Sequence, residues 1–183
     1  MNIQSRNKRQ KLEIGEPIPY FCMTATDEKI YSSNSFPEAA CLVVIFTSNH
    51  CPYAKLYEER IVSTSREFAE KGVQFLAICS NDGQAFPEDC FENMKLKKYP
   101  FPYLHDETQQ VAKSFDAQAT PEAFVFDSNL ALKYHGAIDD SPETKSLIKK
   151  NFLTDAIVSV LKGEMLQTTE APLIGCSIKW KIR

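Results

Sequence analysis

The stretch Cys41-Leu-Val-Val-Ile-Phe-Thr47, followed by Ser48-Asn-His-Cys-Pro-Tyr53, is the part of the sequence that decides the fold. Its first run is almost entirely apolar, as expected for a strand that is buried on both faces of a sheet. Pro52 then begins a helical pattern, in a position where proline is favoured, and Gly72 ends that pattern. The sequence therefore predicts a strand that leads directly into a helix, with Cys51 at the turn between them.

Strands and helices alternate after this unit. Strands are expected at 73–79, 103–104, 123–126 and 131–135, and helices at about 87–98, 106–115 and 141–163. A β-hairpin is expected between residues 15 and 36, and a C-terminal extension follows residue 163. The order predicts an α/β class fold, with a central mixed sheet flanked by helices on both faces.

Length and composition limit the classes of function. The chain has 183 residues, 43% hydrophobic and 25% charged, with a net charge of -3 and a pI near 5.7. These values predict a single domain over residues 13–183, preceded by a polar tail at 1–12. An acidic balance argues against a nucleic-acid or anionic-membrane partner. The chain has neither an apolar run long enough to span a membrane nor a secretion signal, so we expect a cytoplasmic protein.

Six cysteines stand in the chain, at positions 22, 41, 51, 79, 90 and 176. A domain of this size does not need disulfide bonds for stability, and reduced thiols are the rule in the cytoplasm. None of the cysteines forms a CxxC pair or has zinc-site spacing with a histidine. We therefore expect no bound metal. We also expect no cofactor, because the sequence has no glycine-rich phosphate loop.

Cys51 is the candidate nucleophile. At the first turn of a helix, free backbone N–H groups and the positive end of the helix dipole favour a thiolate over a thiol. The neighbouring His50 and Lys55 are expected to lower the thiol pKa further. The alternative interpretation is that Cys51 is a small buried hydrophobic residue with no chemistry.

Thr120-Pro121 is the second feature of interest. It lies just before the strand expected at 123–126, where a cis proline would turn the backbone toward Cys51. These two residues are expected to shape the substrate groove.

Several longer motifs carry a resemblance to a known family. They are Asn49-His-Cys-Pro-Tyr53, Phe101-Pro-Tyr-Leu-His-Asp-Glu107, Thr120-Pro121, Tyr134-His-Gly-Ala-Ile-Asp-Asp140 and Gly175-Cys-Ser-Ile-Lys-Trp180. Over residues 13–181 the chain resembles the thioredoxin-like superfamily, in its redoxin or alkyl hydroperoxide reductase/thiol-specific antioxidant (AhpC/TSA) branch, and within it the peroxiredoxin-like proteins. The resemblance implies a thioredoxin-like fold with a cis proline, Pro121, beside the redox turn.

The chain departs from the patterns of both groups at the turn. Ala54 stands where thioredoxins have their second cysteine, which excludes dithiol exchange within one helical turn. Thr47 lies four residues before Cys51, whereas typical peroxiredoxins have a threonine three residues before the peroxidatic cysteine. Arg60 and Arg66 are the nearest arginines that a peroxide could use, and both fall on the same helix as the cysteine.

Cys176 is the other cysteine that falls within one of these motifs. If the C-terminal tail folds back over the turn, Cys176 could act as a distant resolving thiol for Cys51. The alternative is that its motif only packs the tail onto the domain, with Trp180 as the anchor.

The resemblance implies a thiol-dependent oxidoreductase with antioxidant activity. Its partners would be a peroxide or disulfide substrate and a thiol electron donor, and the sequence does not define an oligomeric state. Two alternatives stay open. One is a disulfide reductase without peroxidase activity. The other is a redox-inactive thioredoxin-fold module that binds an extended peptide beside Pro121.

Overall fold

A five-stranded mixed sheet forms the centre of the computed structural model, which describes residues 11–182. The strand order is β5-β4-β3-β7-β8. Strand β4 runs parallel to its two neighbours, β3 and β5, whereas β7 is antiparallel to both β3 and β8. Their bounds are β3 Cys41–Phe46, β4 Val73–Cys79, β5 Tyr103–His105, β7 Glu122–Asp127 and β8 Leu132–Gly136. The predicted α/β class and mixed sheet are confirmed.

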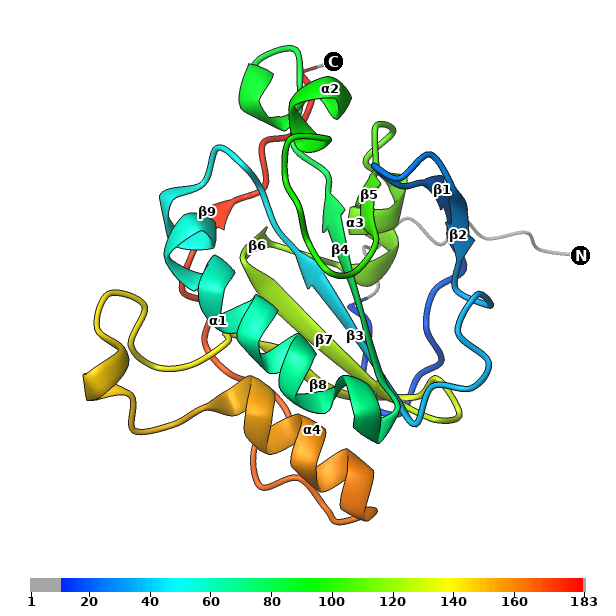
Figure 1. Ribbon diagram of the computed structural model, residues 1–183, viewed down its shortest axis with the longest axis vertical. Coiled ribbons are helices and arrows are strands. Elements are labelled where there is room, and N and C mark those ends of the chain that lie inside the picture. Colours follow the sequence, from blue (N-terminus) through cyan, green and yellow to red (C-terminus); the bar gives the residue numbers. More distant parts are fainter. Residues whose placement is uncertain (1–10, 183) are drawn as a thin grey trace, which may run out of the picture.

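Helices cover both faces of this sheet. In Figure 1, α1 (Pro52–Phe68) and α4 (Phe152–Lys162) lie over one face, where they share a core with the odd-numbered side chains of β3. The other face packs against α3 (Gln110–Phe115) and the N-terminal hairpin of β1 (Cys22–Thr24) and β2 (Ile30–Ser32). Alternating side chains of a strand point to opposite faces, so the apolar run of β3 supplies both cores.

The segment after β4 is less helical than the sequence pattern suggests. The predicted helix 87–98 is a 3-10 turn at Pro87–Asp89, followed by the single-turn helix α2 (Phe91–Met94). The Asp89 side chain is fully buried and bonds to the turn before Cys51, so this segment is tied to the interior instead of continuing as a surface helix.

The last helix begins later than residue 141. A loop with a 3-10 turn at Lys145–Leu147 precedes α4, and Leu147, expected on the buried stripe, is 64% exposed. Arg60 donates to the backbone carbonyls of Ser141 and Pro142, which keeps those groups out of a helix. The Asn151 side chain instead accepts a hydrogen bond from the N–H of Thr154 and caps α4 at its actual start.

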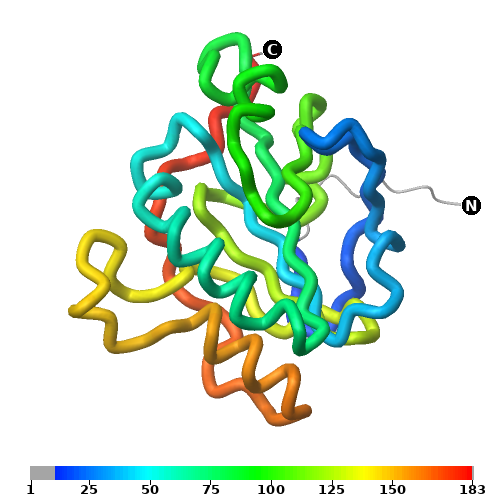
Figure 2. Tube along the Cα trace, viewed as in Figure 1, coloured from blue at the N-terminus to red at the C-terminus, as the bar shows by residue number. Residues whose placement is uncertain are grey.

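Segments near both ends of the described chain lie against the domain. The C-terminal extension forms β9 (Cys176–Ser177), which pairs antiparallel with β6 (Ala119–Thr120), and Figure 2 shows this red segment beside the start of α1. Of the polar tail predicted at 1–12, residues 1–10 lie outside the described residues, but Leu12 is buried in the core. None of the described helices is long and apolar enough to cross a membrane.

Candidate redox site

Cys51 lies at the start of α1, between the end of β3 and the first helical residue, Pro52. Its Sγ accepts a hydrogen bond from the Ala54 N–H at 3.4 Å, one of the amides that a helix leaves unpaired in its first turn. The thiol also lies 3.0 Å from the carbonyl oxygen of Thr120, to which it can donate. Only 1% of the residue is exposed, so the thiol is buried but lies directly beside the Thr120-Pro121 peptide.

Cys176 is brought to the same place by the pairing of two short strands. Thr120 of β6 is opposite Cys176 of β9. The preceding Gly175 permits this approach, because a Cβ there would lie 2.3 Å from the Thr120 carbonyl oxygen. The Cys176 thiol hydrogen-bonds to Cys51, and the backbone N–H of Tyr53 donates to it. The first turn of α1 therefore holds both sulfur atoms, one through Ala54 and the other through Tyr53.

The environment separates the pKa values of the two thiols. Burial alone would raise the pKa of Cys51, but hydrogen bonds from the Thr120 side chain, the Ala54 N–H and Cys176 outweigh it, and the pKa is lowered. Burial raises the pKa of Cys176, as do its hydrogen bond to Cys51 and the charge on Cys51. Of the two thiols, Cys51 is therefore favoured to ionise first, and Cys176 is favoured to keep its proton.

Thr120 can serve both protonation states of Cys51. Its carbonyl oxygen accepts from the neutral thiol, while its buried hydroxyl makes no other hydrogen bond among the described residues and is free to donate to a thiolate. The Thr120-Pro121 peptide bond is cis, as the resemblance implied.

His50 and Lys55 lie on the outer side of the turn. The His50 ring contacts Phe86, and its Nδ1 is 3.6 Å from a carboxylate oxygen of Glu88. The pKa of Glu88 is lowered first by its own backbone N–H and then by His50 and Lys55. The groups that lower the pKa of Cys51 are Thr120, Ala54 and Cys176, so an electrostatic role of His50 and Lys55 stays a prediction.

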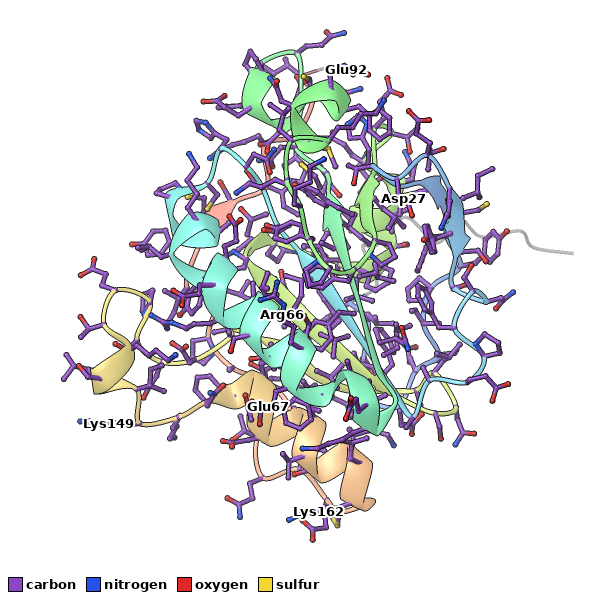
Figure 3. The ribbon with its side chains drawn as sticks, viewed as in Figure 1. Asp27, Arg66, Glu67, Glu92, Lys149 and Lys162 are labelled. Carbon is purple, nitrogen blue, oxygen red and sulfur yellow. The ribbon has the colours of Figure 1, made fainter. Side chains whose placement is uncertain are left out.

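Arg60 and Arg66, the two arginines considered as partners of a peroxide, both lie away from the thiol pair. Arg60 is bound to the buried Asp139 at 2.6 Å, in addition to its two backbone acceptors in the loop before α4. Arg66, labelled in Figure 3, is exposed on α1, and 15 residues of helix place it about 22 Å along the axis from Cys51. Neither side chain contacts the thiol pair.

The remaining four cysteines are also free thiols. Cys41 and Cys79 are buried in the sheet, and burial raises the pKa of both, that of Cys41 to about 12. Cys22 is exposed and Cys90 is half-buried. Residues 11–182 contain no cluster of three or more His, Cys, Asp or Glu side chains that could hold a metal ion.

Sequence reasoning missed the polar groups beneath the turn. Ser48, Asn49 and Asn81 all hydrogen-bond to the buried carboxylate of Asp89. The pattern placed Asp89 in the first turn of a helix, and no signal in one sequence indicates that this carboxylate points inward. Asn81, in a segment expected to be an ordinary loop, carried no signal either.

A thiol at the end of a central strand, a helix that begins beside it and a facing cis proline define a thioredoxin-like protein. Comparison with protein families places the chain within this class. The model of the AhpC/TSA family matches residues 14–135, and the chain belongs to this family.

Solved structures share the fold of this chain. The chain is similar to an uncharacterized conserved protein from Geobacillus kaustophilus, with 38% identity, coverage of 94% of each chain and a TM-score of 0.88. A hypothetical protein from Sinorhizobium meliloti has 35% identity over 95% of this chain and 98% of that chain, also with a TM-score of 0.88. A DsbE-type thiol:disulfide interchange protein from Chlorobium tepidum shares the fold, with 15% identity, a TM-score of 0.66 and coverage of 82% and 99%. The curated proteins contain no match.

Proposed function

We propose that this protein is a thiol-dependent oxidoreductase with peroxiredoxin-like antioxidant activity, in which Cys51 is the nucleophile and Cys176 is the resolving thiol. The observation that carries the proposal is the pairing of Thr120 with Cys176, which brings the Cys176 side chain to the Cys51 thiol at the start of α1. The lowered pKa of Cys51 and the raised pKa of Cys176 agree with these two roles. A thiolate is the attacking form of cysteine, and a second thiol in contact with it can close a disulfide without movement of the helix.

With a peroxide, the Cys51 thiolate attacks one oxygen and the O–O bond breaks. The leaving alkoxide or hydroxide takes a proton, and Cys51 becomes a sulfenic acid. The Cys176 thiolate then attacks the Cys51 sulfur and expels hydroxide, which leaves a Cys51–Cys176 disulfide. The two thiols have supplied two electrons to the peroxide, and a thiol electron donor returns them.

With a disulfide substrate, the same thiolate attacks one sulfur and expels the other as a thiolate. Cys176 then attacks the Cys51 sulfur of the mixed disulfide, releases the second half of the substrate and forms the same intramolecular disulfide. The engagement of Arg60 by Asp139 favours this second candidate function, because that arginine is not available to orient a peroxide.

The pKa of Cys176 supports an order of events. The pKa is raised by burial first, and then by the hydrogen bond to Cys51 and the charge on Cys51. Once Cys51 is covalently occupied it carries no thiolate charge, whereas Lys179 and the Tyr53 N–H still favour a Cys176 thiolate. The resolving thiol therefore becomes more acidic after the first step and not before it.

The strand position beside Thr120 counts against the binding-module alternative. That position is filled by β9 of the same chain, so an extended peptide would first have to displace it. We also propose that the protein works in the cytoplasm, where small and protein thiols supply electrons.

Peptide mass spectrometry after stoichiometric oxidation tests the proposal. Reduced protein is treated with one equivalent of hydrogen peroxide or of a small aromatic disulfide, and thiols are trapped in acid. We expect a Cys51–Cys176 crosslink in the wild type, and a Cys51 sulfenic acid or mixed disulfide in Cys176→Ser. Consumption of each oxidant by wild type and Cys51→Ser distinguishes peroxidase from reductase. An unmodified Cys51 with both oxidants would leave the binding module as the better explanation.

A further inference from the structure

The side chain of Asp89 is a buried carboxyl group whose hydrogen bonds come from neutral donors. Its side chain is inaccessible to solvent, and no Lys or Arg of residues 11–182 forms an ion pair with it. One oxygen accepts from the backbone N–H groups of Asn49 at 2.6 Å and His50 at 3.3 Å. The other accepts from the Ser48 hydroxyl and the Asn81 amide, each at 2.8 Å. A buried carboxylate is costly unless its donors are kept in place, so this group demands a defined position for the turn.

The same contacts reach the backbone of the nucleophile. The Ser48 hydroxyl, which donates to Asp89, also accepts from the backbone N–H of Cys51 at 3.0 Å. The orientation of the Cys51 backbone therefore depends on Asp89 through one intervening side chain. None of these four hydrogen bonds of Asp89 involves the sulfur atom of Cys51 or of Cys176.

Asn81 connects this cluster to the strand that carries Cys176. Its amide nitrogen donates to Asp89 and Ser48, and its side-chain oxygen accepts from the backbone N–H of Lys179 at 2.8 Å. The carbonyl of Lys179 accepts from the N–H of Asp82 at 2.9 Å, next to Asn81 in the chain. Lys179 lies three residues after Cys176, so these bonds hold the tail in register.

We propose that Asp89 is the positioning residue of the Cys51–Cys176 pair, because it fixes the turn directly and the tail strand through Asn81. The proposal rests on the proposed function, in which these two thiols form a disulfide. Two sulfur atoms on separate segments react at a rate set by how often they meet in the correct geometry, and a displacement of about 1 Å can cost about 100-fold in such a reaction.

A matched carboxylate is available as a control. Asp106 is also buried, at 2% exposure, and accepts from the Ser80 hydroxyl and from the N–H groups of Val111 and Ala112 at the start of α3. Its carboxylate makes no hydrogen bond to residues 48–51 or 176–181. Asp106→Asn should therefore reduce stability in the same way as Asp89→Asn without affecting the thiol pair.

The first experiment is equilibration of the folded proteins with reduced and oxidised glutathione, below their unfolding temperatures. We expect the equilibrium constant for the Cys51–Cys176 disulfide to fall at least about tenfold in Asp89→Asn, a shift of about 30 mV for a two-electron couple. Asn81→Ala removes the connection to the tail but leaves three of the four hydrogen bonds to Asp89 in place, so it should give a smaller fall in the same direction. Asp106→Asn should equal the wild type. Equal values for Asp89→Asn and Asp106→Asn would overturn the proposal.

The second experiment uses reduced protein, so it does not depend on disulfide formation. Amide hydrogen exchange should become faster at Asn49, Cys51 and Lys179 in Asp89→Asn, and mainly at Lys179 in Asn81→Ala. Unchanged exchange at these amides would also overturn the positioning role. Faster exchange in a protein whose wild type forms no Cys51–Cys176 disulfide would contradict the proposed function and leave Asp89 as the group that organises the turn.

Discussion

Cys41 is the first residue of β3, and Cys51 lies at the start of α1, the helix that follows this strand. Both residues are almost completely buried. Nevertheless, their pKa values shift in opposite directions. Cys41 is paired within the sheet, and burial together with the charge of Asp127 raises its pKa to about 12. Cys51 is at a helix start, where hydrogen-bond donors outweigh the same effect of burial. Hydrogen-bond donors at the helix start, and not exposure to solvent, therefore lower the pKa of Cys51 relative to that of Cys41.

The strongest test of this contrast exchanges sulfur for oxygen at both positions. Cys51→Ser should lower turnover of peroxide and disulfide substrates by at least about 100-fold, because the nucleophile is removed. Cys41→Ser should keep turnover but lose about 1–3 kcal/mol of stability, since it buries a hydroxyl in the sheet. Initial rates and urea unfolding of both variants check the pair of outcomes. Normal turnover by Cys51→Ser would remove the distinction.

The approach of the second thiol is the next feature to alter. Gly175→Ala places a Cβ against the Thr120 carbonyl oxygen, so β9 must move away and Cys176 with it. We expect disulfide formation after oxidation to slow by about tenfold or more, measured by acid quench and mass spectrometry.

Gly163→Ala is the control for this substitution. Gly163 ends α4 at a φ of 67° with no atom within 4 Å of the added Cβ, so the change introduces backbone strain of about 1 kcal/mol without a steric clash. Disulfide formation should keep its wild-type rate there. Equal slowing in both variants would mean that the effect comes from stability alone.

The Thr120 hydroxyl contributes a single hydrogen bond to the lowering of the Cys51 pKa, and this contribution can be removed by itself. Thr120→Val keeps the carbonyl acceptor and the shape of the residue but removes a donor to the thiolate, so the pKa of Cys51 should rise toward its ordinary value. The midpoint of the pH profile of iodoacetamide alkylation, followed at the Cys51 peptide, measures this shift. Thr47→Val is the control, because the buried Thr47 side chain bonds to Tyr99 instead. An unchanged midpoint in Thr120→Val would exclude the hydroxyl as a cause.

The smallest expected effect is a difference in how stability depends on pH. A lowered pKa in the folded protein means that ionisation of Cys51 stabilises it as pH rises from that pKa to the ordinary thiol pKa, near 8.5. Reduced wild type should gain stability over Cys51→Ser in this window, by about 1.4 kcal/mol for each unit of lowering. The raised pKa of Cys41 has the opposite sign, and stability is lost as pH rises above 8.5. Urea unfolding of the reduced proteins across this pH range, with Cys41→Ser alongside, measures both slopes.

The sequence predicted the elements whose residues follow a clear pattern. The apolar run of β3 and Pro52 after Cys51 were sufficient for the central strand, the start of α1 and the candidate nucleophile. The predicted hairpin at β1–β2 and the strands expected at 123–126 and 131–135 are also confirmed.

Long-range contacts account for what the sequence did not predict. The first part of the helix expected from residue 141 is a loop, in which Arg60, far away in the chain, binds the carbonyl groups of Ser141 and Pro142. The inward Asp89 belongs to the same category, since its hydrogen bonds come from two other segments, residues 48–50 and Asn81. Cys176 was proposed from a motif, whereas its place beside Cys51 depends on strand pairing that no local pattern encodes.

The position of Cys176 on β9 couples the oxidation state of the thiol pair to the attachment of the C-terminal segment. In a helix-borne cysteine pair, both sulfur atoms belong to one rigid element, and oxidation changes little beyond it. Here one sulfur belongs to α1 and the other to the final segment of the chain, which hydrogen bonds and packing hold to the domain. A disulfide between them would add a covalent anchor to that segment, so the oxidation state of the site would set how firmly the C-terminus is held.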